Sequence, residues 1–278
     1  MTGIDTAPPP STVGFFHELR TGAWRQANVI FALIFKELKS RMESESYGGV
    51  IWVVLNPIQN VVVLAAFWYL IGRTEIGGIH IALFLAVGMV PFTIVRMCLS
   101  SIPAAIRSNR SFFNFQQVKP IDAVIARFAL NVSLTIIGAA LMFFLIAWFL
   151  GVFLRLDHLL EVMSLFILAL AMGLGIALLV ATYGTMYEPI LKVLSFFSRP
   201  LLFLSAVFHP AGELPTAARY WLSWNPLVHI IEYLRHYALG MKVFPEADIA
   251  WPLVFTLIVL FLGITGYYGN RHRLIQTR

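Results

Sequence analysis

The stretch that decides the fold lies between two long apolar runs and reads SIPAAIRSNRSFFNFQQVKPIDAVIAR at residues 101–127. Its apolar residues recur at helical spacing, and Arg107 and Arg110, three positions apart, share another face. One proline falls in the first helical turn, where its missing N–H does no harm, and Pro120 stops the helix before the next apolar run. We therefore predict a short amphipathic helix over 101–120 that lies at a membrane surface and presents a binding surface to another protein.

The composition around this stretch is that of an integral membrane protein. Of 278 residues, 59% are hydrophobic and 12% are charged, a balance that would not keep a water-soluble globule of this size in solution. The formal net charge of +6 is what cytoplasmic loops alone would contribute, so it does not indicate a nucleic-acid partner. Cys98 is the only cysteine, which excludes an intrachain disulfide.

Six runs of the sequence are apolar enough to cross a bilayer, because a span needs roughly 20 such residues. They cover residues 50–71, 79–99, 124–150, 160–182, 193–208 and 249–268. We predict an all-α membrane protein whose six transmembrane helices form one domain over residues 1–278. If the N-terminus is inside, most lysines and arginines fall on the same side, so the positive-inside rule places both termini in the cytoplasm.

Two further segments are predicted to lie against the membrane without crossing it. Residues 15–42 combine apolar and basic positions in the pattern of an interfacial amphipathic helix, which would serve as an anchor or as a functional contact. Residues 208–242 are moderately apolar but broken by prolines and glycines, so we expect two short helices, over 215–223 and 227–239, that dip into the outer leaflet. We favour a re-entrant gate there over a loop that merely rests on the surface.

The charged residues in and near the spans allow more than one role. Arg199 lies in the fifth run, where a cation either faces a cavity or a partner, or snorkels to the interface. His229, Glu232 and Arg235 are three apart on one helical face, which more often forms a satisfied polar stripe than an acid–base pair. The sequence contains no close cluster of histidine ligands and no GxxxxGKS/T phosphate loop, so it predicts neither a metal site nor an ATP site in this chain.

Three stretches carry a resemblance to a known family: GVIWVVLNP at 49–57, FNFQQVKPIDAVIAR at 113–127 and LSWNPLVHIIEYLR at 222–235. With them the chain, from about residue 28 onward, resembles the inner-membrane permeases of bacterial ABC exporters for group 2 capsular polysaccharide, within the ABC-2 permease family. Each motif is weak alone, and the combination is specific.

The resemblance implies a bacterial inner-membrane protein that works as a homodimer with two separate nucleotide-binding ATPase subunits, which would bind ATP and Mg. Residues 101–120 would be the coupling helix, with the contact candidates Arg107, Arg110, Phe112, Phe113, Lys119 and Asp122. Residues 208–242 would be the periplasmic gate, with the candidates Trp224, Asn225, His229, Glu232 and Arg235. Related permeases export a lipid-linked acidic polysaccharide and hand it to a periplasmic adaptor, or co-polymerase, and an outer-membrane channel.

A passage for a long sugar polymer needs sliding contacts, and aromatic faces supply them because sugars stack on them weakly and interchangeably. The candidates for lining such a passage are Trp68, Tyr69, Phe196, Phe197, Arg199 and Phe203. Contact with lipid remains the alternative for each aromatic residue.

Two other functions compete with export of a capsule glycan. The first is an ABC-2 permease for O-antigen, teichoic acid or a smaller amphipath. The sequence from Lys119 to Asp122 favours the capsule branch over this alternative. The second is an intramembrane enzyme that would use His229 and Glu232. It would need a nucleophile or metal ligands at the same cavity, and the sequence offers no convincing set.

Overall fold

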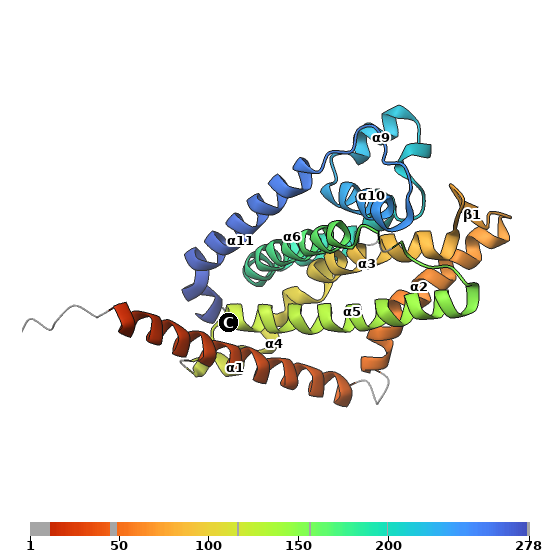
Figure 1. Ribbon diagram of the computed structural model, residues 1–278. Helices are drawn as coiled ribbons and strands as arrows, with labels where there is room; N and C mark the ends of the chain where they lie inside the picture. The colour runs from red at the N-terminus through yellow and green to blue at the C-terminus, as the bar shows by residue number, and fades with distance from the viewer. Residues whose placement is uncertain (1–11, 45–48, 116, 156, 199, 277–278) are drawn as a thin grey trace, which may run out of the picture.

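The computed structural model describes residues 12–44, 49–115, 117–155, 157–198 and 200–276, and nearly all of its regular structure is helical (Figure 1). Its longer helices are α1 (Thr12–Ser44), α2 (Gly49–Leu70), α3 (Ile81–Ser100), α5 (Pro120–Leu150), α6 (Leu159–Met186), α7 (Glu188–Phe197), α10 (Pro226–Leu239) and α11 (Ala250–Gln276). The shorter ones are η2 (Ile102–Ala104), α4 (Ala105–Ser108), η3 (Arg110–Asn114), α8 (Leu201–Leu204), η4 (Ala211–Glu213) and α9 (Thr216–Leu222). A hairpin of β1 (Glu75–Ile76) and β2 (Ile79–His80), paired antiparallel, joins α2 to α3.

Four helices among the described residues are long and apolar enough to cross a membrane. They are α3 with its continuation to Ser108, α5, α6, and α11 as far as Leu274. In α2 the apolar stretch is shorter, and Pro57 lies inside the helix. The chain is therefore a multi-pass membrane protein. Its second, third, fourth and sixth predicted spans are confirmed as long apolar helices, while the count of six spans stays a prediction.

The fifth predicted span, 193–208, does not form one continuous helix. α7 ends at Phe197, and α8 covers only four residues. Pro200 stands between them and has no N–H to donate, so it cannot make the backbone hydrogen bond that would continue α7. After α8, Ala206 has a positive φ of 52°, which ends the helical path. Arg199 lies outside the described residues, so both of its predicted roles remain open.

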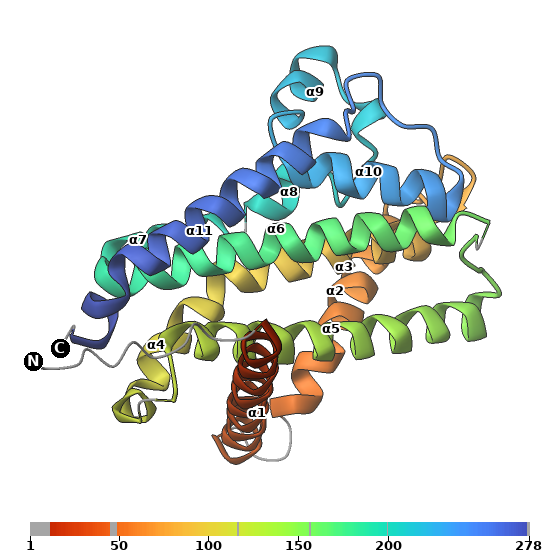
Figure 2. The same cartoon turned by 60° about the vertical axis from the view of Figure 1, so that its left-hand side comes forward.

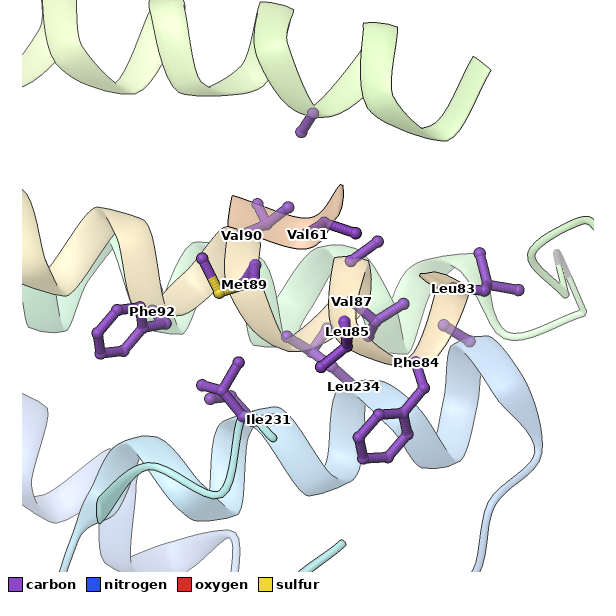
Figure 3. Close-up of a cluster of buried hydrophobic side chains, with 14 of the residues drawn as sticks. Val61, Leu83, Phe84, Leu85, Val87, Met89, Val90, Phe92, Ile231 and Leu234 are labelled. Atoms are coloured by element: carbon purple, nitrogen blue, oxygen red, sulfur yellow. The ribbon is translucent and has the colours of Figure 1, made fainter. Parts of the chain in front are cut away.

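Of the four long apolar helices α3 is the most deeply buried, and it lies among α2, α5, α6 and α10 (Figure 2). Every residue from Ile81 to Val95 is buried, because α2, α5, α6 and α10 all pack against this helix. Figure 3 shows the contact with α10, where Ile231 and Leu234 lie against the apolar side chains of α3. A helix that is apolar all round is expected in this central position.

Glycines allow α6 and α11 to pack backbone against backbone. A Cβ atom on Gly175 would lie 2.8 Å from the backbone nitrogen of Leu260, and one on Gly263 would lie 2.9 Å from the carbonyl oxygen of Gly175. Since real Cβ atoms do not approach backbone so closely, only glycine fits at either position. The packing of α6 against α11, the most extensive contact between two helices, is therefore set by residue size as well as by hydrophobicity.

Two flanking segments cover different parts of the bundle. α1 runs beside α5 and contacts α2, whereas α9 and α10 lie on the side of α3 that is remote from α1 (Figure 1). The helices predicted over 15–42, 215–223 and 227–239 are all present as helices. Their placement in one membrane leaflet or the other stays a prediction.

Candidate functional site

The joint, residues 101–120, is built differently from the single amphipathic helix that its sequence predicts. η2, α4 and η3 follow one another directly after α3, so the joint continues a membrane-crossing helix in three short pieces. Asn109 causes the second break. Its side-chain amide donates to the carbonyl of Ala105 at 2.9 Å, and its backbone N–H turns to Ile106 at 3.3 Å. The side chain thus takes the carbonyl to which the next helical turn would bond.

The apolar face of the joint is buried inside this protein. Ile102, Ala105 and Ile106 are inaccessible, and Phe113 is only 8% exposed. Phe113, which was predicted as a contact for a partner, packs in the core of this chain, and its contact with a partner stays a prediction. Phe115 is the exposed aromatic residue of the joint, with 63% of its surface accessible.

The remaining predicted contact residues have mixed positions. Phe112 is half-buried, and the Lys36 ammonium of α1 lies 5.2 Å from the centre of its ring. Arg107 is half-buried and donates to the carbonyl of Gly184, near the end of α6, at 3.1 Å. Arg110 is half-buried and Lys119 is exposed. Both positive charges can therefore be reached from outside.

Asp122 is a structural residue of the α5 N-terminus. Its carboxylate accepts the backbone N–H of Lys119 at 2.9 Å and the side-chain amide of Gln26 at 2.9 Å. It is 1% exposed. A carboxylate at this position satisfies otherwise free N–H groups and complements the helix dipole. Within this chain Asp122 thus caps α5 and binds α1, while its role as a direct contact for a partner stays a prediction.

A buried ion pair that the sequence did not reveal connects the joint to α1. The Arg127 guanidinium, in α5, donates to the Glu37 carboxylate at 2.9 Å, to the Ser101 carbonyl at 3.2 Å and to the Ser108 hydroxyl at 2.7 Å. Arg127 and Glu37 are each 8% exposed. A single guanidinium thus holds α1, the end of α3 and α4 together.

Two further contacts strengthen the same connection. Lys36 donates to the Asn109 side-chain oxygen at 2.9 Å, and the Asn131 amide of α5 donates to the Ser101 hydroxyl at 3.0 Å. No local sequence pattern signals this network, because Glu37 and Arg127 are 90 residues apart.

Arg235, predicted as a gate residue, is enclosed within the protein. It donates to the carbonyls of Ala206 and Val207, each at 2.7 Å, and to the Glu232 carboxylate at 3.1 Å. Its guanidinium carbon lies 3.6 Å from the centre of the Phe84 ring in α3. Burial lowers the pKa of Arg235 to about 10, so the side chain is still a cation at neutral pH.

The hydrogen bonds between Arg235, Glu232 and the backbone hold the loop around Arg235 in place. Glu232 also accepts the backbone N–H of Ala211, and burial raises the pKa of its carboxyl group while Arg235 opposes that shift. A Cβ on Gly88 would lie 2.7 Å from a guanidinium nitrogen of Arg235, so α3 has a glycine where this side chain crosses it. Glu232 and Arg235 therefore fix the chain reversal after α8 and do not line an open surface.

His229 has a fixed tautomer in the same segment. Its Nδ1 accepts the backbone N–H of Asp248 at 2.9 Å, so the proton is on Nε2, which donates to the Ser223 carbonyl at 2.7 Å. Asn225 caps α10 through the N–H of Leu227 at 3.0 Å. These contacts occupy the polar atoms of both side chains, and no group of three or more acidic, histidine or cysteine side chains that could hold a metal occurs in the described part of the chain.

The aromatic candidates for a passage lie at separate places in the described part of the chain, and their role in a passage stays a prediction. Tyr69 lines a hollow between α2 and α5 to which the other candidates do not contribute. Trp68 is half-buried, and the Arg73 guanidinium lies 5.5 Å from the centre of its ring. Phe196, Phe197 and Phe203 are 55–73% exposed on α7 and α8, and the Phe203 ring stacks on Phe208 at 4.8 Å. Among the predicted gate residues only Trp224, at 61%, is strongly exposed.

Comparison with known proteins identifies the family. A model of the family described as ABC-2 type transporter matches residues 28–239, which include every helix from α2 to α10. The chain belongs to the ABC-2 type transporter family.

The similar curated proteins extend this result over nearly the whole length. The polysialic acid transport protein KpsM of Escherichia coli is 30% identical over 93% of this chain and 99% of its own. The capsule polysaccharide export inner-membrane protein CtrC of Neisseria meningitidis serogroup A is 26% identical over 86% of this chain and 89% of its own. The capsule polysaccharide export inner-membrane protein BexB of Haemophilus influenzae is 23% identical over the same shares of 86% and 89%.

Proposed function

We propose that this chain is the membrane-spanning permease of an ATP-driven exporter that moves a lipid-linked acidic capsular polysaccharide across the bacterial inner membrane. The observation that carries the proposal is the similarity, over almost the full length of the chain, to transport proteins named for polysialic acid and for capsule polysaccharide. Both termini are placed in the cytoplasm, because most of the lysines and arginines then lie inside.

ATP hydrolysis is assigned to a separate pair of nucleotide-binding subunits, which bind ATP and Mg. The joint is the surface that we propose for them, since Arg110, Phe115 and Lys119 remain accessible while Ile102, Ala105, Ile106 and Phe113 are buried inside the protein. Movement of the joint would reach α1 and α5 through Arg127, because this side chain binds all three elements.

Export through the membrane is assigned to the surface between two copies of this chain. The exposed Phe196, Phe197 and Phe203 on α7 and α8 support a sliding surface for sugars in such a dimer. α9 and α10 would form the periplasmic side, from which the polymer passes to an adaptor or co-polymerase and an outer-membrane channel. The hydrogen bonds of Arg235 would then hold the immobile part of this gate in place.

Deletion of the gene in its own bacterium tests the proposal. The cells should lose surface capsule and accumulate the same acidic polysaccharide inside, and the wild-type gene supplied in trans should restore the capsule. Loss of O-antigen or teichoic acid with capsule intact would instead establish one of the other ABC-2 cargos. Unchanged surface glycans together with a lost hydrolytic activity would support the intramembrane enzyme.

A further inference from the structure

A cavity of about 320 Å³ lies where the joint meets the last turns of α11. Its walls come from the joint and the start of α5, from α11 and, through Gln26, from α1. The residues that α11 contributes are Tyr267, Tyr268, Arg271 and His272. The end of α11 is therefore part of the surface beside the joint, although the two segments are remote in sequence.

Buried contacts fix the end of α11 to the joint. Leu274 is inaccessible and Tyr267 is 4% exposed, and both belong to one apolar cluster with Ile106 and Phe113 of the joint. The Tyr267 hydroxyl also accepts the backbone N–H of Ile121, in the first turn of α5, at 3.4 Å. The walls of the cavity are thus held by the core of the protein, and we expect the end of α11 to move together with the joint.

The charges at the cavity favour an anionic occupant. Its charged or titratable side chains are all basic, and each of them is exposed: Lys119, Arg271 and His272. Among the described residues no carboxylate forms an ion pair with Lys119 or Arg271. The carboxylate closest to them along the chain, Asp122, is 1% exposed and accepts the backbone N–H of Lys119 and the side-chain amide of Gln26. A complementary negative charge must therefore come from outside the described part of the chain.

The rim of the cavity favours a protein as the source of that charge. Phe115 is 63% exposed and Tyr268 is 59% exposed, so two accessible aromatic rings line the same cavity as the cations. Accessible aromatic rings beside an arginine are typical of the residues that dominate protein–protein interfaces. Phe115 and Lys119 also belong to the surface proposed above for the nucleotide-binding subunit, so the cavity is continuous with that surface.

We propose that this cavity receives an acidic side chain of the nucleotide-binding subunit, which makes the end of α11 a second docking element beside the joint. The proposal rests on the proposed function for the existence of that subunit. It adds Tyr268 and Arg271, which lie outside the joint, to the residues that bind it.

Titration of the nucleotide-binding ATPase proposed as the partner onto the full-length chain, in phosphatidylcholine nanodiscs, tests this docking. Arg271→Glu should weaken binding about tenfold at low salt, because it places a carboxylate against the acidic side chain. Arg271→Lys keeps the charge and should bind within about threefold of the wild type. The matched control is Lys39→Glu, which makes the same change in charge at a 77% exposed position outside the cavity and should bind like the wild type. Wild-type affinity in Arg271→Glu would overturn the proposal.

Thermal unfolding separates docking from a structural role. Arg271 is exposed, so Arg271→Glu should leave the unfolding temperature unchanged, whereas Tyr267→Ala empties a buried position and should lower it. If Arg271→Glu lowered the unfolding temperature as much as Tyr267→Ala, Arg271 would be a structural residue and the proposal would be overturned.

Cross-linking with a carbodiimide identifies the group that enters the cavity. The reagent joins a carboxylate to an amine, so the amine introduced by Arg271→Lys should couple to an aspartate or glutamate of the nucleotide-binding subunit, as detected by mass spectrometry. Absence of this product would overturn the proposal. So would an Arg271→Glu variant that loses binding of dioleoylphosphatidylglycerol but keeps that of the subunit, because the occupant would then be a lipid. A wild-type chain that binds no nucleotide-binding subunit would refute the proposed function as well, whereas normal binding by both wild type and Arg271→Glu would refute this proposal alone.

Discussion

Arg235 and Arg127 are both buried cations, but they are held by different kinds of partner. Arg235 binds two neighbouring loop carbonyls and a carboxylate on its own helix. Arg127 binds a carboxylate on α1, the carbonyl that ends α3 and a hydroxyl on α4. The first arrangement fixes one local chain reversal. The second joins elements far apart in sequence, which is what a site that transmits movement from the joint requires.

The largest expected effect follows from removing the buried hydrogen bonds of Arg235. Arg235→Leu leaves the Glu232 carboxylate and two carbonyls buried without their partner, so the free energy of unfolding should fall by about 3–5 kcal/mol. Thermal unfolding of the purified protein in nanodiscs measures this. Arg73→Gln is the matched control, because the Arg73–Glu213 pair is 44% exposed on both sides and should contribute at most about 1 kcal/mol. An equal decrease in the free energy of unfolding in both variants would show that Arg235 does not hold the chain reversal in place.

The network at Arg127 should respond with a change in coupling. Glu37→Gln keeps the shape but removes the charge that Arg127 binds, so stability should fall by about 1–2 kcal/mol, less than for Arg235→Leu. Export per ATP hydrolysed should fall further than ATP hydrolysis itself, because α1 is no longer held to the joint. The control is Glu43→Gln in the same helix, at a carboxylate that is 67% exposed. Export and hydrolysis that fall in strict proportion would argue against transmission through Arg127.

The joint offers two phenylalanines that separate binding from folding. Phe115→Ala removes an exposed ring and should weaken ATPase binding about tenfold, or 1.4 kcal/mol, without changing the unfolding temperature. Phe113→Ala empties a core position and should instead destabilise the protein by about 3 kcal/mol. Titration of the purified ATPase, together with thermal unfolding, distinguishes the two. If Phe113→Ala weakened binding while Phe115→Ala did not, the exposed surface of the joint would be misassigned.

The smallest expected effect is the pH response of His229. Burial lowers the pKa of its imidazole below the ordinary value of 6.5, and protonation of Nδ1 would break the bond from Asp248. The unfolded chain therefore binds the proton more readily, so stability is complete above about pH 6.5 and is lost as the pH falls below it. His229→Gln should flatten the unfolding temperature between pH 7 and pH 5, whereas His17→Gln, at an exposed position, should not. Identical pH profiles for all three proteins would contradict this.

The sequence predicted well the features that depend on apolar length. Four spans, α9 and α10 were found near their expected positions. Hydrophobic runs predict the spans, and Asn225, Pro226 and Gly240 mark where α10 begins and ends. It also placed Glu232 beside Arg235, since three-residue spacing brings them together on a helix.

The failures concern contacts between distant residues and local competition for hydrogen bonds. The pairing of Arg127 with Glu37 spans 90 residues, and no local pattern encodes it. The helix breaks at Asn109 because the Asn109 side chain, in place of a backbone N–H, binds the Ala105 carbonyl. The burial of Phe113 depends on which helices surround it. The fifth run looked long enough to span, but the chain around Pro200 divides it into two short helices.

Transport into inverted vesicles tests the central claim most directly. Vesicles that contain this chain and the nucleotide-binding ATPase proposed as its partner should take up the lipid-linked acidic polysaccharide only when ATP is supplied and hydrolysed. Vesicles with Glu37→Gln should hydrolyse ATP but take up less polymer for each ATP. Hydrolysis without any uptake by the wild-type complex, or uptake by the ATPase without this chain, would contradict the account.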